Sequence, residues 1–397
     1  MKKIIALLLV AVMVLGLVAC GGDKKDKDTF KVGFIFLHDE NSTYDNNFMM
    51  AAKAVQKELN LTDDQVIFKV NVPEGNECFD AAEDLVDMGC DVIFADSFGH
   101  ESYMIQAAKE YTDVQFCHAT GTQAKVEKLS NYHNAFASIY EGRFLAGIAA
   151  GLKLNEMIAS GKITADKAKI GYVGAFPYAE VKSGYTSFFL GARSVCPTAT
   201  MDVKFTDSWF DIGKEKSAAE SLMSDGCVLI SQHADSEGAP KACEAAGVPN
   251  IAYNISTISM APNTAIISSK INWAPYFKLM IESVQKGEAI PTDYCGTIET
   301  GSVELTELNE KAAAAGTKEA IDAAMAKFKA GELKVFDTSK FTVKGAALAE
   351  YAADINGDYK PDEGVNVIKD GYFNESDANA HRSAPYFDLD IDGITIK

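Results

Sequence analysis

His233 and Asp235 are the two residues of this chain whose types and spacing most readily suggest acid–base chemistry. In hydrolases a histidine beside a carboxylate activates a nucleophile, but the sequence contains no G-x-S-x-G elbow to present a serine. It also lacks the aspartate-rich amino-terminal motif of nucleoside hydrolases. We therefore interpret the pair as a hydrogen-bond donor and acceptor that line a binding site, and we predict no catalytic residue.

A second candidate for chemistry is the acidic segment Asp354-Ile-Asn-Gly-Asp358, which resembles the start of a calcium loop. An EF-hand loop requires Gly at its sixth position and Glu at its twelfth, where this chain has Tyr359 and Val365. A turn is the expected structure, with calcium binding as the alternative. No other cluster of His, Cys or acidic residues has metal-site spacing, so we predict neither a metal nor a cofactor.

Aromatic residues form the third group, because several of them directly follow strand-like segments: Tyr44, Phe98, Phe176, Trp209 and Phe210. A ring at such a position can stack on a flat ligand, and a base stacked on an aromatic side chain gains roughly 1–3 kcal/mol. Each ring could instead pack between secondary-structure elements. For Tyr44 we favour the ligand, whereas for Trp209 the two interpretations have equal weight.

The elements that would position these residues alternate between short apolar strands and helices. Strands are predicted at 31–36, 65–72, 91–95 and 114–117, and the alternation restarts with a helix at 140–154 and strands at 169–174, 199–205, 227–231 and 250–253. This pattern predicts right-handed βαβ units in two doubly wound sheets, one in each of two lobes that face a cleft. Ligands of such sheets bind beyond the carboxyl ends of the strands, where the candidate residues lie.

The amino-terminal residues predict export. Two lysines precede an uncharged apolar segment at 4–18, which is shorter than the roughly 20 residues needed to span a bilayer. Small residues then precede Cys20, as in a lipoprotein cleavage site. We expect residues 1–19 to be a signal peptide and 20–29 a lipidated tether that holds the protein on the outer side of the cell membrane. The alternative is an ordinary secretory signal in which Cys20 is incidental.

Composition restricts the possible partners. The chain has 37 Lys and Arg against 56 Asp and Glu, a net charge of −19. This excess of negative charge disfavours nucleic acid and anionic lipid, and it is compatible with a neutral or cationic small ligand. The seven cysteines other than Cys20 are odd in number and contain no C-x-x-C, so we expect buried free thiols.

Several segments that occur in one order carry a family resemblance. They are 32–36, 139–147, 169–177, 191–194, 208–211, 232–236 and 272–276. With them the chain resembles the basic membrane protein (BMP, PnrA-like) family of ABC-transporter substrate-binding lipoproteins, from about residue 31 to about 287. The resemblance implies a type I periplasmic-binding fold of two Rossmann-like lobes with three hinge crossovers, and a cognate ABC permease. Relatives bind purine nucleosides, and one branch, which this chain resembles more, binds free purine base.

The resemblance also implies where a purine would lie. One ring comes from the loop after the first strand, and the matching residue is Tyr44. Asp45 and Asn46 would contact the edge of the base or cap the following helix. Phe98 follows the third strand, and Gly99 lets a ligand approach the backbone.

The opposite lobe would supply the second ring face and further polar contacts. Phe176 or the Trp209-Phe210 pair is expected to complete the sandwich, with His233 and Asp235 lining the cleft.

Ribose recognition is where the chain departs from the family pattern. In the nucleoside-binding branch an acidic residue and a lysine on the next strand hold the ribose. This chain has Asn254 and Ser256 in place of the acid, and Lys270 lies near the lysine position. Free purine base and purine nucleoside therefore both stay open as ligands.

The expected domain boundaries follow from these assignments. Lobe 1 comprises 30–137 plus about 272–292, lobe 2 comprises 138–271 plus about 293–335, and 336–397 forms an acidic extension packed on a lobe. We expect a monomeric receptor for an importer. The alternatives are a receptor for a membrane signalling partner and an exported nucleoside-cleaving enzyme.

Overall fold

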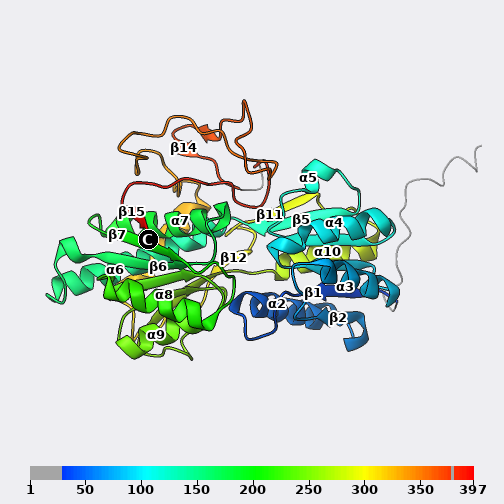
Figure 1. The fold of residues 1–397 in the computed structure, drawn as a ribbon, viewed down its shortest axis with the longest axis horizontal. Coiled ribbons are helices and arrows are strands. Elements are labelled where there is room, and N and C mark those ends of the chain that lie inside the picture. Colours follow the sequence, from blue (N-terminus) through cyan, green and yellow to red (C-terminus); the bar gives the residue numbers. More distant parts are fainter. Residues whose placement is uncertain (1–28, 377–379) are drawn as a thin grey trace, which may run out of the picture.

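The computed structural model describes residues 29–376 and 380–397. The signal peptide, Cys20 and all of the expected tether except Thr29 lie outside these described residues. Two sheets with helices against them form two lobes, lobe 1 on the right of Figure 1 and lobe 2 on the left. The predicted α/β class is confirmed, because all neighbouring strands of the two large sheets pair in parallel except β12, which is antiparallel to β10.

Lobe 1 contains a six-stranded sheet with the order β11-β5-β4-β3-β1-β2. Its elements are β1 (Val32–Ile35), α2 (Thr43–Leu59), β2 (Val66–Lys69), α3 (Asn76–Asp87), β3 (Val92–Ala95), α4 (Glu101–Glu110), β4 (Gln115–Ala119), α5 (Ala124–Glu127), β5 (Tyr132–Ala137), α10 (Ala274–Lys286) and β11 (Asp293–Gly296). Strands β1 and β3 are buried along their whole length and consist of apolar residues, as is typical of a parallel sheet covered on both faces.

Lobe 2 contains a seven-stranded sheet with the order β12-β10-β9-β8-β6-β7-β15. Its elements are α6 (Ile139–Ala159), β6 (Lys169–Gly174), α7 (Ala179–Val195), β7 (Thr200–Phe205), α8 (Ile212–Ser224), β8 (Leu229–His233), α9 (Gly238–Ala246), β9 (Asn250–Tyr253), β10 (Ala265–Ile271), β12 (Val303–Leu305), α11 (Thr317–Lys329) and β15 (Ile394–Ile396). Helices α6 and α7 cross closely because Gly147 and Gly191 have no side chain; a Cβ atom on either would lie 2.1 Å from a carbonyl oxygen of the other helix.

The chain crosses between the two sheets after β5, after β10 and after β11. The last crossing differs slightly from the expected boundary near residue 293. Strand β11 pairs in parallel with β5, with Asp293 opposite Asn134, so residues up to Gly296 belong to the sheet of lobe 1. A short edge strand of this kind is difficult to predict from the residues around it, because its pairing partner is distant in the sequence.

The extension at 336–397 contacts both lobes, whereas the sequence suggested packing on a single lobe. On lobe 2, β15 pairs in parallel with β7. On lobe 1, the backbone N–H of Ser383 donates to the Asp293 carboxylate at 3.0 Å. The buried rings of the extension are continuous with the hydrophobic core of the lobes, and those of Phe336 and Phe387 stack with centroids 4.4 Å apart. Figure 1 shows the extension, in orange to red, lying over α7 and reaching toward β11, with the short hairpin strands β13 (Ile368–Lys369) and β14 (Tyr372–Phe373).

Two further expectations concern the whole chain. The seven cysteines of the described residues are free and buried, as the sequence predicts. Burial raises the pKa of several of these thiols, that of Cys90 to about 12. None of the helices in the described part of the chain has the length and continuous apolar character needed to cross a membrane.

Candidate ligand-binding site

A small cavity, here called the inner compartment, lies between the lobes at the carboxyl ends of β1, β3, β4 and β8. Both lobes line it. Its residues are Leu37, His38, Tyr44, Asp45, Ser97, Phe98, Thr120, Glu180, Trp209, His233 and Asp235. Its volume of about 20 Å³ has room for about one water molecule. A larger planar ligand therefore requires the walls of this compartment to move apart.

The walls are close because the lobes touch directly. The backbone N–H of Thr43 in lobe 1 donates to the Asp235 carbonyl in lobe 2 at 2.8 Å. Nearby, the ring of Phe98 stacks on Tyr178 with centroids 5.3 Å apart. A hinge movement about the three crossings would open the compartment.

Tyr44 is held in place at the start of α2. Ser42 caps this helix, its side chain accepting a hydrogen bond from the N–H of Asp45. The Tyr44 hydroxyl donates to the Asp96 carbonyl at 2.8 Å, and its ring meets Phe48 edge-on with centroids 4.8 Å apart. With both ends restrained, the ring is presented to the inner compartment in a fixed orientation.

Two buried carboxyl groups on lobe 1 have opposite pKa shifts. Burial raises the pKa of Asp96 well above its ordinary value, and the nearby charge of Asp45 adds to the rise. Burial alone would raise the pKa of Asp45 too, but hydrogen bonds from His38 and Ser42 outweigh it and lower that pKa. The Ser42 hydroxyl donates to Asp45 at 2.5 Å and the His38 N–H at 2.8 Å. These shifts favour the charged form of Asp45 and the neutral form of Asp96.

On lobe 2, His233 and Asp235 line the compartment but have different partners. His233 Nε2 lies 3.3 Å from a carboxylate oxygen of Glu180, and burial lowers the pKa of this histidine. The Asp235 carboxylate accepts a hydrogen bond from Asn254 at 3.1 Å. Burial raises the pKa of Asp235, and the charge of Glu215 adds to this rise. The pair thus places an imidazole and a carboxyl group, both able to form hydrogen bonds, in the lining of the compartment.

Arg143 is a buried cation close to His233 and Asp235. Sequence analysis assigned it no role in the site. It projects from α6, is 1% exposed, and donates through Nη1 to the Gln232 carbonyl at 3.0 Å. Its guanidinium lies 3.6 Å from the centroid of the Tyr253 ring. Its positive charge lowers the pKa of His233 and that of Asp235, opposing the effect of burial on the latter. The only sequence signal for it was its place in the 139–147 segment.

Six of the residues predicted for the site line the inner compartment together: Tyr44, Asp45, Phe98, Trp209, His233 and Asp235. Five further lining residues were not predicted individually: Leu37, His38, Ser97, Thr120 and Glu180. Thr120 directly follows β4 and has a positive φ of 63°, and Glu180 lies in the first turn of α7. Examination of every residue just after each strand would have found most of them.

The other predicted residues lie outside the lining of the inner compartment. Phe176 packs on Trp209, their centroids 5.1 Å apart, and the Phe210 ring meets His38 across the cleft at 5.2 Å. Asn46 lies further along α2. The N–H of Gly99 donates to Glu74 at 2.7 Å, so this amide is already occupied.

The three positions considered for ribose are engaged elsewhere. The Asn254 side chain donates to Asp235, as described above, and Asn254 lines neither cavity of the cleft. The Ser256 hydroxyl donates to Glu307 at 2.7 Å. Lys270 forms an ion pair with Glu304 of β12 at 3.5 Å.

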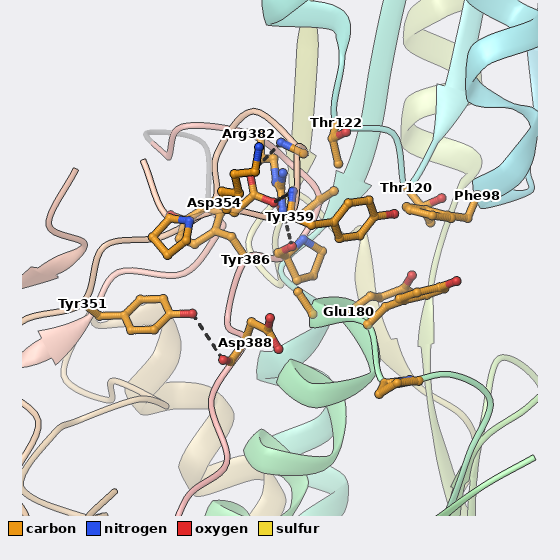
Figure 2. Close-up of a pocket in the computed structure, with 18 residues that line it drawn as sticks. Phe98, Thr120, Thr122, Glu180, Tyr351, Asp354, Tyr359, Arg382, Tyr386 and Asp388 are labelled. Carbon is orange, nitrogen blue, oxygen red and sulfur yellow. Dashed lines mark hydrogen bonds between the residues drawn. The ribbon is translucent and has the colours of Figure 1, made fainter. Parts of the chain in front are cut away.

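A second and larger cavity, here called the outer compartment, adjoins the inner one and shares Phe98, Thr120 and Glu180 with it. Its volume is about 160 Å³. Lobe 1 and lobe 2 form two of its walls, and the extension forms the third, as Figure 2 shows. The residues from the extension are Tyr351, Asp354, Gly357, Tyr359, Lys360, Pro361, Arg382, Ala384, Pro385, Tyr386 and Asp388. Sequence analysis did not predict this wall.

The acidic segment at 354–358 is part of that wall and forms a turn. Asp354 accepts hydrogen bonds from the N–H groups of Gly357 and Tyr359, at 2.7 and 2.9 Å. Among the residues that the structure describes, no group of three or more His, Cys, Asp or Glu side chains is placed to hold a metal ion.

Comparison with known proteins identifies related chains. The model of the family described as ABC transporter substrate-binding protein PnrA-like matches residues 38–335. A purine-binding protein of Brucella abortus is 32% identical over 279 residues, which cover 68% of this chain and 74% of that protein. A putative ABC transporter glucose-binding protein of Haloferax volcanii is 35% identical over 217 residues, which cover 55% of this chain and 52% of that protein.

Solved structures show the same fold. A solute-binding protein from Conexibacter woesei superposes with a TM-score of 0.62 at 18% identity, covering 77% of this chain and 98% of that one. One from Aeropyrum pernix superposes with a TM-score of 0.63 at 16% identity, covering 77% and 93%.

Proposed function

We propose, from the premise that this chain belongs to the PnrA-like family of ABC transporter substrate-binding proteins, that it captures a purine between its two lobes. The ligand is a free base or a nucleoside, and the protein delivers it to a cognate ABC permease. The fold is the type I periplasmic-binding fold that the resemblance implies.

The observation that carries this proposal is the chemistry of the inner compartment. Rings from both lobes, Tyr44, Phe98 and Trp209, line it together with the carboxyls of Asp45 and Asp235. A purine is flat and has N–H donors on its edge, so it suits a site of ring faces and carboxyl groups that accept hydrogen bonds. Each stacked ring would contribute roughly 1–3 kcal/mol. The purine-binding relative from Brucella abortus supports the same ligand class.

Attachment and assembly complete the proposal. The protein would be a monomer, held on the outer face of the cell membrane by a lipid on Cys20. It would perform no chemistry on its ligand. In support, His233 contacts the carboxylate of Glu180. Asp235 lines the same compartment, but these three residues do not form the Ser-His-Asp arrangement of a hydrolase.

A hydroxylated sugar is the second candidate ligand, because the relative from Haloferax volcanii is named as a putative glucose-binding protein. Carboxylates beside aromatic rings also suit sugars, whose hydroxyls donate to the former and whose C–H faces pack on the latter. That match spans only about half of either chain, which favours the purine.

Calorimetry on the chain from residue 29 onward tests the proposal. The titrants are adenine, guanine, hypoxanthine, their nucleosides, and glucose as the competing class. We expect at least one purine to bind and glucose not to bind. Chromatography of a nucleoside after incubation with the protein should show no released base. Binding of glucose alone would refute the purine assignment, and released base would refute the assignment as a pure binding protein.

A further inference from the structure

We propose that the carboxyl-terminal extension completes a second subsite, the outer compartment, which takes the hydroxylated sugar of a purine nucleoside whose base lies in the inner compartment. This inference rests on the proposed function and names its ligand more closely. The family match ends at residue 335, so the residues that carry the inference lie outside it.

The two compartments are adjacent parts of one site. Phe98, Thr120 and Glu180 line both. Glu180 contacts His233 on the inner side at 3.3 Å and also borders the outer cavity. Once the lobes move apart to admit the base, a ligand with a flat part and a polar part would lie across these shared residues and place one part in each compartment.

The outer compartment offers the mixture of groups that sugar hydroxyls require. Thr120, Glu180 and Asp388 supply oxygen acceptors, and Arg382 supplies donors. Arg382 is 6% exposed and donates to the carbonyls of Ala384 and Pro385, at 3.2 and 3.0 Å. Among the described residues, its Nη1 atom is buried without a hydrogen-bond partner. A ligand oxygen that reached this buried donor would give it a hydrogen-bond partner, which would favour binding.

The same groups distinguish a hydroxylated ligand from a phosphate. Three carboxylates, Glu180, Asp354 and Asp388, and two cations, Lys360 and Arg382, border the cavity, so acidic groups are in excess and disfavour an anionic group. A neutral sugar meets no such repulsion and can donate hydrogen bonds to these carboxylates.

Tyr359 is the side chain that the extension presents most openly to this cavity. It is 73% exposed and sits in the left-handed region with φ of 63°, which is costly for a tyrosine. Asp354 holds this conformation by accepting the Tyr359 N–H, and the Gln123 side chain ties the same loop to lobe 1 by donating to the Asn356 carbonyl at 2.6 Å. In Figure 2 the ring points toward Phe98 and Thr120. An exposed ring held in a strained conformation over a cavity is suited to pack on the face of a sugar.

The residues that the family resemblance would assign to ribose leave this role open. Lys270 is paired with Glu304, and Ser256 with Glu307. Neither lines a compartment. In this proposal the groups that contact the sugar therefore come from the extension.

The test compares each purine base with its own nucleoside by calorimetry, using the chain from residue 29 onward. We expect the unmodified chain to bind a nucleoside more tightly than the base. Tyr359→Ala should weaken nucleoside binding about tenfold, equivalent to about 1.4 kcal/mol, and change base binding less than about twofold. Tyr359→Phe keeps the ring and should keep the preference. Tyr372→Ala is the matched control, because Tyr372 lies in the extension but lines neither compartment.

Three outcomes would overturn the inference while leaving the proposed function intact. They are equal affinity of the unmodified chain for base and nucleoside, a Tyr359→Ala variant that loses both ligands equally, and one that loses neither. Tighter binding of the nucleoside 5′-monophosphate than of the nucleoside would make the subsite an anion site and would also overturn it. If no purine binds in any form, the proposed function itself fails.

Discussion

The inner and outer compartments differ in origin as well as in chemistry. The inner one is built entirely from residues within the 38–335 family match, except Leu37, whereas eleven of the outer lining residues come from the extension beyond that match. The inner volume is about 20 Å³ and the outer about 160 Å³. The compartment within the family match therefore lies where the two lobes touch, and the extension forms a wall of the outer compartment only.

The contrast is also electrostatic. Burial raises the pKa values of Asp96 and Asp235 at the inner compartment, so these carboxyls are neutral over a wider pH range than usual. At the outer compartment, Asp388 is 55% exposed and forms an ion pair with Lys182 at 2.7 Å. A change in pH should therefore affect the buried inner carboxyls more than the exposed Asp388 of the outer compartment. Substitutions in the two compartments can be tested separately.

Removal of the inner ring should have the largest effect. Tyr44→Ala deletes one stacking face, so we expect a loss of roughly 1–3 kcal/mol in binding, or about one to two decades in affinity. Because the base is common to both ligands, base and nucleoside should lose affinity equally. Titration of the variant with both ligands measures this, with an unfolding curve as the control for stability. A loss confined to the nucleoside would place Tyr44 against the sugar and would contradict the assignment of the inner compartment.

The buried acid beneath the inner wall should make stability depend on pH. Burial raises the pKa of Glu215 from 4.5 to about 7, although the side chain accepts hydrogen bonds from the Ser236 hydroxyl and backbone. The folded state favours the neutral carboxyl, so this contribution to stability is fully present below the ordinary pKa of 4.5 and is lost as the pH rises through about 7.

Glu215→Gln should flatten that dependence. The difference in unfolding free energy between pH 4.5 and pH 8 should shrink by roughly 3 kcal/mol in the variant. Urea unfolding at both pH values measures it. Glu220→Gln, on the exposed side of the same helix, is the matched control, since Glu220 is 55% exposed. Equal pH dependence in the Glu215 variant and the unmodified chain would show that this carboxyl is charged in the folded state.

The smallest effect is expected at Lys270, which lies outside both compartments. Its ion pair with Glu304 is partly exposed on both sides, and such pairs contribute about 0–1 kcal/mol. Lys270→Ala should therefore change the affinity for base and nucleoside less than about twofold. Selective loss of nucleoside binding in this variant would show that Lys270 of β10 contacts the sugar, and it would refute the assignment of the sugar to the outer compartment.

Much of the fold and part of the site were predictable from local patterns. Apolar segments such as 31–36 and 91–95 contain β1 and β3, and the rule that ligands bind beyond strand ends located Tyr44, Phe98 and His233 at one cavity. The rule could not tell which post-strand ring faces the cavity. Phe176 and Phe210 satisfy it as well as Trp209 does, but their packing depends on Trp209 and His38, which come from other turns of the chain.

The sequence by itself determined the α/β class, the family and the candidate inner residues, because strand and helix periodicity and short motifs are encoded among near neighbours. Only the tertiary structure decided that the extension bridges both lobes and forms a third wall. The contacts responsible join the extension to lobe 1, at Asp293 with Ser383 and Gln123 with Asn356, and to lobe 2, where β15 pairs with β7. They link residues far apart in the chain and follow no periodic pattern. Such contacts depend on how the two folded lobes are placed relative to each other. The residues near each contact in the sequence do not encode that placement.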